Sequence, residues 1–152
     1  MECKIRLARE GDAEEVSHVI LWALRETNAK DYIRDFIERV ELNFSPSVVR
    51  DLMGIRRVFI AEVGHRIVGT ASLDRTVVRT VFVAPDSQGL GVGRLLMGEV
   101  ERAAREMGVK VLEVPSTITA EPFYAKLGFK AVHDSYYGEE RTIIMERSLA
   151  PL

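Results

Sequence analysis

The chain has 152 residues and a formal net charge of −2, from 21 Lys and Arg residues against 23 Asp and Glu residues. This length suits one domain, and a domain of this size buries roughly 70% of the surface that its unfolded chain exposes. The near balance of charges gives no support to broad attraction toward nucleic acid or an anionic membrane. We therefore expect a single domain over residues 1–152 that binds neither of them.

Cysteine and histidine content bears on compartment and metal binding. The single cysteine, Cys3, excludes an internal disulfide and is typical of a reducing compartment. No apolar run approaches the roughly 18 residues of a membrane span, and the N-terminal residues lack the order of a signal peptide. These features predict a cytoplasmic protein. The three histidines have no metal-ligand spacing, so we expect no metal site: His18, His65 and His133.

Helical patterns dominate the first third of the chain. Residues 4–9 alternate apolar and polar side chains, which predicts a strand, and Asp12 is the expected cap of a following helix. Pro46 marks the start of another short helix, because a proline at the first helical position loses no hydrogen bond. Two apolar faces at helical spacing support this pattern: Val16, Val19, Ile20, Ala23 and Leu24 in one helix, and Ile33, Phe36, Ile37 and Val40 in a second.

After Gly54 the pattern becomes that of strands. Residues 56–63, 66–74 and 75–85 are rich in β-branched side chains, which predicts antiparallel strands joined by tight turns. A long helix ending at Gly108 is expected next, with one apolar face: Val92, Leu95, Leu96, Val100, Ala103 and Met107.

The last third predicts one crossover and a final strand. Residues 109–114 are expected as a strand buried on both faces, and residues 119–129 as a short helix ended by Gly128. Residues 141–149 are expected as a last strand after a loop. Early helices, a mostly antiparallel sheet and one strand–helix–strand crossover together predict an α+β fold.

Three glycines at alternate positions, Gly89, Gly91 and Gly93, separate the strand that ends near Val83 from the long helix. The entrance of a helix leaves about four N–H groups without intrahelical partners and carries roughly half a positive charge. Glycines there remove side chains that would hold a phosphate away from those groups. The loop is therefore predicted to bind a phosphate or pyrophosphate, and a tight turn that merely needs positive φ is the alternative.

The residues after the glycines narrow the choice of ligand. A nucleoside-triphosphate loop ends in Lys followed by Ser or Thr, whereas Arg94 follows Gly93. A dinucleotide fingerprint that starts at Gly89 meets Arg94 in place of its third glycine, although Glu113 lies where a ribose-binding acid belongs. Fewer than about 60 residues remain for a doubly wound sheet, so a nicotinamide-dependent oxidoreductase is the more distant interpretation.

Two segments carry a resemblance to a known family. "VFVAPDSQGLGVGRLLM" resembles the acetyl-coenzyme A signature Q/R-x-x-G-x-G/A of the GNAT superfamily of N-acetyltransferases, with Gln88, Gly91 and Gly93 at the fixed positions. "AEPFYAKLGF" resembles the second conserved block of the same superfamily, and Gly69 lies where members usually carry glycine. The matched segments run from about residue 57 to 146 in the expected order.

The resemblance implies a GNAT-like α+β fold, with a mostly antiparallel central sheet flanked by helices. Two of its strands would splay apart around the pantetheine arm of acetyl-CoA. The arm would be bound by the backbone of Val81, Phe82 and Val83. The pyrophosphate would be bound by the N–H groups from Gln88 to Arg94: Gln88, Gly89, Leu90, Gly91, Val92, Gly93 and Arg94.

Two side chains near this implied site keep two interpretations each. The Arg94 guanidinium either adds a charge-assisted contact to the cofactor or is a solvated surface group. Some relatives carry asparagine near the end of the splayed strand, where Thr117 either substitutes through its hydroxyl or belongs to a simple loop.

By the same resemblance, Tyr124 occupies the position at which a phenol typically protonates the departing coenzyme A thiolate. Packing beside Phe123 and Phe129 is the alternative role. A phenol with a pKa near 10 is mostly protonated at neutral pH and can serve as an acid. The base that accepts the amine proton is not assigned, because the candidates rest on residue type alone: Glu62, His65, Asp74, Glu113 and His133.

The activity that the resemblance implies is direct acetyl transfer from acetyl-CoA to a primary amine of a small molecule or protein. A non-catalytic module that binds acetyl-CoA as a regulatory ligand is the alternative of a different class. Many relatives form dimers, so a homodimer is a further expectation. Acidic residues in the early helices and in residues 133–140 either suit a cationic amine or form solvated faces: Glu26, Asp31, Asp35, Glu38, Glu41, Asp134, Glu139 and Glu140.

Overall fold

The computed structural model describes residues 2–26, 38–39, 41–138 and 140–149. The helix expected around Ile33 and Phe36 lies outside these residues. None of the helices within the described ranges combines the length and the apolar character that crossing a bilayer requires.

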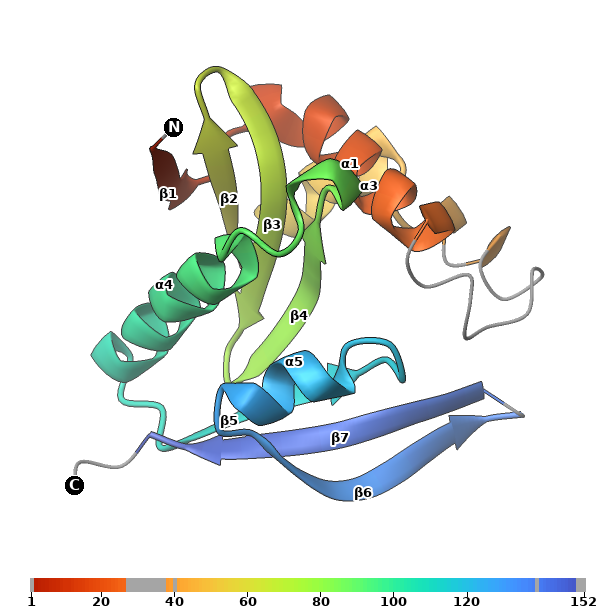
Figure 1. Cartoon of the computed structure of the whole chain (residues 1–152), viewed down its shortest axis with the longest axis vertical. Helices are drawn as coiled ribbons and strands as arrows, with labels where there is room; N and C mark the ends of the chain where they lie inside the picture. The colour runs from red at the N-terminus through yellow and green to blue at the C-terminus, as the bar shows by residue number, and fades with distance from the viewer. Residues whose placement is uncertain (1, 27–37, 40, 139, 150–152) are drawn as a thin grey trace.

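A seven-stranded sheet forms the centre of the fold, in the order β1-β2-β3-β4-β5-β7-β6 (Figure 1). Neighbouring strands pair antiparallel, except that β4 and β5 run parallel. The mostly antiparallel sheet confirms the expected α+β class. The strands are β1 (Cys3–Leu7), β2 (Arg57–Val63), β3 (Arg66–Asp74), β4 (Val77–Val83), β5 (Val111–Ser116), β6 (Lys130–Tyr137) and β7 (Glu140–Ser148).

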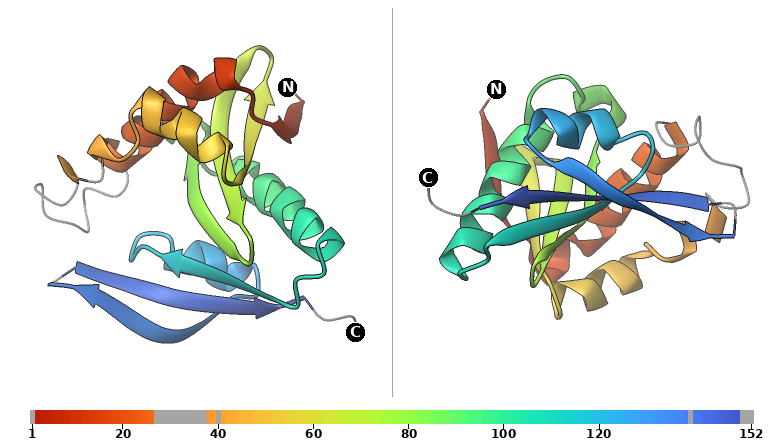
Figure 2. Two further views of the ribbon diagram at one scale, coloured as in Figure 1. Left: turned by 180° about the vertical axis from the view of Figure 1, so that it is seen from behind. Right: turned by 90° about the horizontal axis from the view of Figure 1, so that it is seen from below.

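Helices cover both faces of the sheet (Figures 1 and 2). On one face of β2–β4 lie α1 and α3, and α4 lies on the other face, while α5 packs beside β5 and β7. Their bounds are α1 (Ala13–Glu26), α3 (Pro46–Met53), α4 (Val92–Glu106) and α5 (Glu121–Lys126), with 3-10 turns η1 (Glu10–Asp12) and η3 (Pro85–Ser87).

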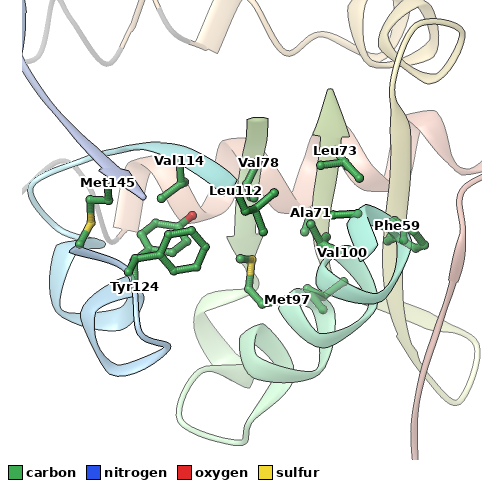
Figure 3. Packing of buried hydrophobic residues seen from close by; sticks show 14 of the residues in the cluster. Phe59, Ala71, Leu73, Val78, Met97, Val100, Leu112, Val114, Tyr124 and Met145 are labelled. Atoms are coloured by element: carbon green, nitrogen blue, oxygen red, sulfur yellow. The ribbon is translucent and has the colours of Figure 1, made fainter. Parts of the chain in front are cut away.

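Each face of the sheet has its own apolar core. The predicted apolar face of α1, from Val16 to Leu24, is buried together with Ile60 and Ile67 of the sheet. The larger core lies under α4 and α5 and extends from Phe59 to Met145 (Figure 3). The two cores explain why β3 is almost entirely buried, because both of its faces are covered.

The α3 helix follows its sequence signals. It begins at Pro46, as expected, and the Ser45 hydroxyl accepts the Val48 N–H at 3.3 Å as its N-cap. A serine in this position satisfies one of the N–H groups that the first helical turn leaves without a partner.

The apolar face of α4 differs from the expected one. Leu95 and Met107 are 48% and 47% exposed, whereas Met97 and Ala104 are buried. Leu95 lies on the flank of the face that Leu96 occupies, and Met107 is the C-cap beyond the last helical turn. The stop at Gly108 is confirmed, with a left-handed φ of 80°.

Two further expectations about the last third were wrong. The β5 strand alternates instead of being buried on both faces: Leu112 and Val114 are buried, and Val111 is 47% exposed. Residues 133–137, expected in a loop, belong to β6, which pairs with β7. Its described side chains are exposed on this edge of the sheet, so its sequence carries no apolar alternation that would have indicated a strand.

Candidate functional site

The strands β4 and β5 part soon after they meet. Val77 and Glu113 are the one paired position in the ladder between these two fully described strands. The β5 strand pairs with β7 along its whole length, whereas β4 stays paired with β3. The β5-facing edge of β4 up to Val83 therefore has no strand paired with it, and Figure 1 shows the two strands diverging; we call the region where they diverge the opening.

A bulge in β4 marks the start of this divergence. Thr70 pairs with Phe82 and Ser72 pairs with Arg79, so two residues of β4 lie where β3 has one. One of them, Thr80, has a φ of 57°, in the left-handed region that a β-branched residue rarely adopts. Beyond the bulge, Phe82 packs with the α1 core while the valines on either side of it pack with the α4 core.

A cavity of about 550 Å³ occupies the opening. This volume is typical of a small-molecule site. All predicted cofactor-binding residues line it except Leu90 and Thr117: Val81, Phe82, Val83, Gln88, Gly89, Gly91, Val92, Gly93 and Arg94. Leu90 is 74% exposed, and the Thr117 hydroxyl accepts the Ala120 N–H at 3.1 Å ahead of α5.

Two of the three loop glycines are required by backbone conformation. Gly89 and Gly91 have φ values of +77° and +84°, which residues with a Cβ adopt only with strain. A Cβ at either position would meet no atom within 4 Å, so crowding is not the reason. Gly91 is the N-cap from which α4 starts, and the pair turns the chain from β4 into α4.

Gly93 has a different role, because it already lies in α4. A Cβ there would come within 3.0 Å of the Phe123 ring of α5. The missing side chain therefore allows α5 to approach the first turn of α4, and the two helices together form one wall of the cavity.

The N-terminus of α4 offers donors to an anion. The first intrahelical hydrogen bond runs from the Leu95 N–H to the Gly91 carbonyl at 3.1 Å. The three N–H groups before Leu95 have no acceptor within the helix and belong to residues that line the cavity. The positive end of the helix dipole and the Arg94 guanidinium add favourable charge for a phosphate.

The Gln88 side chain holds this loop against the strand. Its amide nitrogen donates to the Val83 carbonyl at 3.2 Å. The glutamine at the first fixed position of the glycine signature therefore fixes the loop to the end of β4, next to the α4 N-terminus.

Tyr124 lies in α5 at the side of the cavity and is 4% exposed. Its ring contacts Phe123 and Phe129 edge to face, at centroid distances of 5.1 and 5.7 Å. Figure 3 shows its hydroxyl directed toward the strands at the opening, near Val114. Burial raises the pKa of Tyr124 above its usual range, so the phenol keeps its proton at neutral pH.

The cavity has no general base among the described residues that line it. Its charged lining groups are Arg94 and Lys126, both cations. The acids and histidines considered from the sequence lie elsewhere: Glu62, His65, Asp74, Glu113 and His133. Lys126 was not singled out from the sequence, although it lies three residues after Phe123 and therefore on the same face of α5.

None of the described acids considered as partners for a cationic amine lines this cavity. Glu41 binds Arg25 at 2.6 Å and Asp134 binds Arg141 at 3.1 Å, while Glu26 and Glu38 are exposed. Asp31, Asp35 and Glu139 lie outside the described residues, and the side chain of Glu140 is not described. Within the described ranges, no group of three His, Cys, Asp or Glu residues could hold a metal ion.

Comparisons with known proteins agree with this geometry. Residues 26–145 match the family described as an acetyltransferase (GNAT) domain. The chain is 33% identical over 82 residues to the [ribosomal protein bS18]-alanine N-acetyltransferase of Haemophilus influenzae, which covers 48% of this chain and 56% of that protein. It is also 33% identical over 88 residues to the glucosamine 6-phosphate N-acetyltransferase of Trypanosoma brucei brucei, covering 51% and 60%. The chain thus spans little more than half the length of these curated relatives.

Solved structures share the fold at low identity. A GCN5-related N-acetyltransferase from Rhodopseudomonas palustris superposes with a TM-score of 0.90 at 24% identity, covering 98% of this chain and 97% of that one. The PaiA N-acetyltransferase from Thermoplasma acidophilum, in complex with coenzyme A, superposes with a TM-score of 0.83 at 20% identity, covering 97% and 99%.

Proposed function

Because the chain belongs to the GNAT family of acetyltransferases, we propose that it transfers the acetyl group of acetyl-CoA directly to a primary amine. The observation that carries the proposal is the cavity between the end of β4 and α5, which the glycine loop and the N-terminus of α4 also line. An acyltransferase that uses acetyl-CoA needs such a site for both the thioester arm and the phosphates.

The residues present fit coenzyme A. The two left-handed glycines open the entrance of α4, whose N–H groups and dipole suit the pyrophosphate. The open edge of β4 from Val81 to Val83 has backbone groups that β5 does not pair, and these suit the amides of the pantetheine arm. Arg94 and Lys126 add positive charge around an anionic ligand.

In this proposal Tyr124 supplies the proton in the transfer step. The amine nitrogen attacks the thioester carbonyl, the carbon–sulfur bond breaks, and the sulfur receives the phenolic proton. The surplus proton of the attacking nitrogen leaves to water, since no carboxylate or imidazole is among the described residues that line the cavity, and a proton from water restores the Tyr124 phenol.

The two alternative functions, an oxidoreductase and a non-catalytic module, have less support. A dinucleotide-binding oxidoreductase requires a doubly wound parallel sheet, whereas β4 and β5 are the only parallel neighbours among the described strands. The lack of a base among the described lining residues favours a non-catalytic acetyl-CoA module, but the family match to acetyltransferases and the phenol at the cavity favour the enzyme.

The acceptor is a primary amine in this proposal, since the curated relatives carry the names of enzymes that acetylate a protein alanine and an amino sugar. A cytoplasmic location, a homodimer, one domain over residues 1–152 and the absence of nucleic-acid or membrane partners stay predictions.

Calorimetric titration with acetyl-CoA tests the proposal, with NADH as the comparison ligand. We expect micromolar binding of acetyl-CoA and no binding of NADH, followed by formation of acetylated product in a panel of amines. Binding of NADH alone, or of neither ligand, contradicts the proposed function. Tight acetyl-CoA binding without product from any amine favours the regulatory module.

A further inference from the structure

A second cavity, of about 410 Å³, lies on the side of the sheet that α3 covers. Its walls come from α3, from the residues just before it, from β4 and from Pro115 of β5. We call it the α3-side cavity. It shares no described lining residue with the cavity of the glycine loop.

The two cavities meet at the bulge of β4. Thr80 lines the α3-side cavity and its neighbour Val81 lines the other one. On β5, Pro115 lines the α3-side cavity, whereas Val114 packs in the α4 core with Tyr124. Because successive side chains of a regular strand point to opposite faces, Val114 and Pro115 place the two cavities on opposite sides of β5, where β4 and β5 part. A molecule in the α3-side cavity can therefore approach the end of a ligand bound along β4.

Two guanidinium groups make the α3-side cavity positive. Arg79 Nε lies 3.5 Å from Asp74 Oδ2. Arg56 donates from Nη1 to the Thr80 hydroxyl at 3.2 Å, and its buried Nε has no hydrogen-bond partner. No carboxylate is among the described residues that line this cavity.

Arg56 is in unfavourable surroundings for a cation. Burial and then the charge of Arg79 lower its pKa, and Asp74 opposes this shift. Arg56 also borders a void of about 10 Å³, which has room for a single water. A water there leaves the repulsion between the two arginines in place, whereas an anion in the α3-side cavity would relieve it.

We infer that the acceptor amine carries an anionic group, a carboxylate or a phosphate, and that Arg56 and Arg79 bind this group in the α3-side cavity. The identity of the ligand as an acceptor rests on the proposed function, whereas the anion site rests on the two arginines. The inference replaces the cationic acceptor that the acidic residues of the sequence suggested.

Paired amines that differ only in the anion test the inference by kinetics. The pairs are O-phosphoethanolamine with ethanolamine, and β-alanine with β-alaninamide. For one of the pairs, we expect kcat/KM of the anionic member to exceed that of the neutral member by a factor of about ten or more. The pair that shows this difference tells whether the bound group is a phosphate or a carboxylate. Equal values in both pairs, or higher values for the neutral members, overturn the inference and leave the proposed function intact.

Arginine variants tie the preference to the cavity. Arg79→Gln should raise KM for the anionic member about tenfold and leave kcat and the neutral member nearly unchanged. Arg75→Gln is the matched control, because Arg75 also lies beside Asp74 but its side chain is 91% exposed and does not line the cavity. If the preference for the anionic amine persists in Arg79→Gln, Arg79 does not bind the anion. If Arg75→Gln abolishes the preference equally, the effect does not come from the α3-side cavity.

A binding measurement separates this inference from the proposed function. Calorimetry of the full chain with inorganic phosphate and with β-alanine, with and without coenzyme A, needs no turnover. Binding of one probe that Arg79→Gln weakens about tenfold and Arg75→Gln leaves unchanged supports the anion site even if no amine is acetylated. A wild-type protein that binds neither probe overturns the inference, even if it acetylates ethanolamine.

Discussion

Tyr124 has two properties, a buried aromatic ring and a phenolic hydroxyl, that one substitution can separate. Tyr124→Phe keeps the edge-to-face contacts with Phe123 and Phe129 and removes only the proton donor. Loss of a general acid typically lowers a rate by 10² or more, so we expect kcat to fall roughly 100-fold. The dissociation constant of coenzyme A should change little, because the substitution does not alter the glycine loop or the N-terminus of α4. Steady-state kinetics and calorimetry on the same samples measure both quantities.

The matched control for this substitution is Tyr136→Phe, which removes the hydroxyl of a tyrosine that is 63% exposed in β6. It should leave kcat unchanged. An unchanged kcat in Tyr124→Phe would leave only the packing role of the ring. A parallel loss of coenzyme A binding would instead indicate that the substitution disturbs α5.

Gly69 is a position where absence of a side chain is required by packing. A Cβ there would lie 3.0 Å from Leu96 Cδ1 and 3.2 Å from the Phe82 carbonyl oxygen, so the Leu96 side chain or the β4 backbone would have to shift. We expect Gly69→Ala to lower the free energy of unfolding by about 1–3 kcal/mol, measured by urea denaturation.

Gly98 gives the opposite expectation and serves as the control. It lies within α4, and a Cβ there would meet no atom within 4 Å. Gly98→Ala should therefore raise the free energy of unfolding by about 0.5–1 kcal/mol, because alanine loses less backbone entropy in a helix. If Gly69→Ala and Gly98→Ala changed the free energy of unfolding equally, the packing argument for Gly69 would be wrong.

At the scale of elements, the hairpin between β3 and β4 contains a strained turn. Asp74 pairs with Val77, so the loop has two residues, and the first of them, Arg75, has a φ of 58°. Two-residue hairpins favour glycine at such a position. We expect Arg75→Gly to raise the free energy of unfolding by about 0.5–1 kcal/mol, measured by urea denaturation.

Arg75→Ala separates this effect from the loss of charge. Alanine keeps the Cβ and its strain but removes the weak pairing of the exposed guanidinium with Asp74 at 3.7 Å. It should therefore leave stability nearly unchanged. If alanine stabilises the protein as much as glycine does, the gain comes from the charge and not from the backbone.

The sequence predicted elements well where local chemistry determines them. Pro46 after Ser45, and the glycines around α4, act on the backbone within a few residues, so helix starts and stops follow directly. The strand β6 was missed because its stability comes from pairing with the next strand, β7, and not from an apolar alternation of its own. The exposed Leu95 was misplaced because a small angular difference on a helix decides which side chain meets the sheet.

At the scale of the whole molecule, the two cavities differed in how far the sequence could predict them. The cavity of the glycine loop has a continuous signature in the sequence, from Gln88 to Arg94. The α3-side cavity brings together Arg56, Arg79 and Pro115, which are separated along the chain and meet only because β4 and β5 part on that side. Neither the charge of that cavity nor the loss of solvent around Arg56 has a local sequence pattern.

A partly buried ion-pair cluster near the N-terminus connects β1, η1 and β2 and predicts how stability depends on pH. Arg6 donates to both Asp12 oxygens at 2.9 and 3.1 Å and to Glu62 at 3.3 Å, and the Arg9 N–H donates to Asp12 at 2.8 Å. The Arg6 hydrogen bond, against an opposing effect of burial, lowers the pKa of Asp12 below its usual range. Asp12 was expected to cap the helix that follows it. Its carboxylate instead accepts from Arg6 and from the Arg9 N–H, and so connects β1 with η1.

A carboxyl whose pKa is lower in the folded than in the unfolded protein stabilises the fold above the unfolded value, near 3.9, and this contribution is lost as the pH falls through the folded value. Asp12→Asn should therefore cost about 1–2 kcal/mol at pH 7, and the difference from wild type should shrink below about pH 4. Urea denaturation at intervals from pH 7 to the lowest pH at which the protein stays folded measures this difference. Asp86→Asn is the control, because Asp86 meets Arg66 at 2.9 Å in a pair whose side chains are about half exposed, and such surface pairs contribute little. A cost for Asp12→Asn that stays constant with pH would mean that the carboxylate charge does not stabilise the fold, and that only its geometry does.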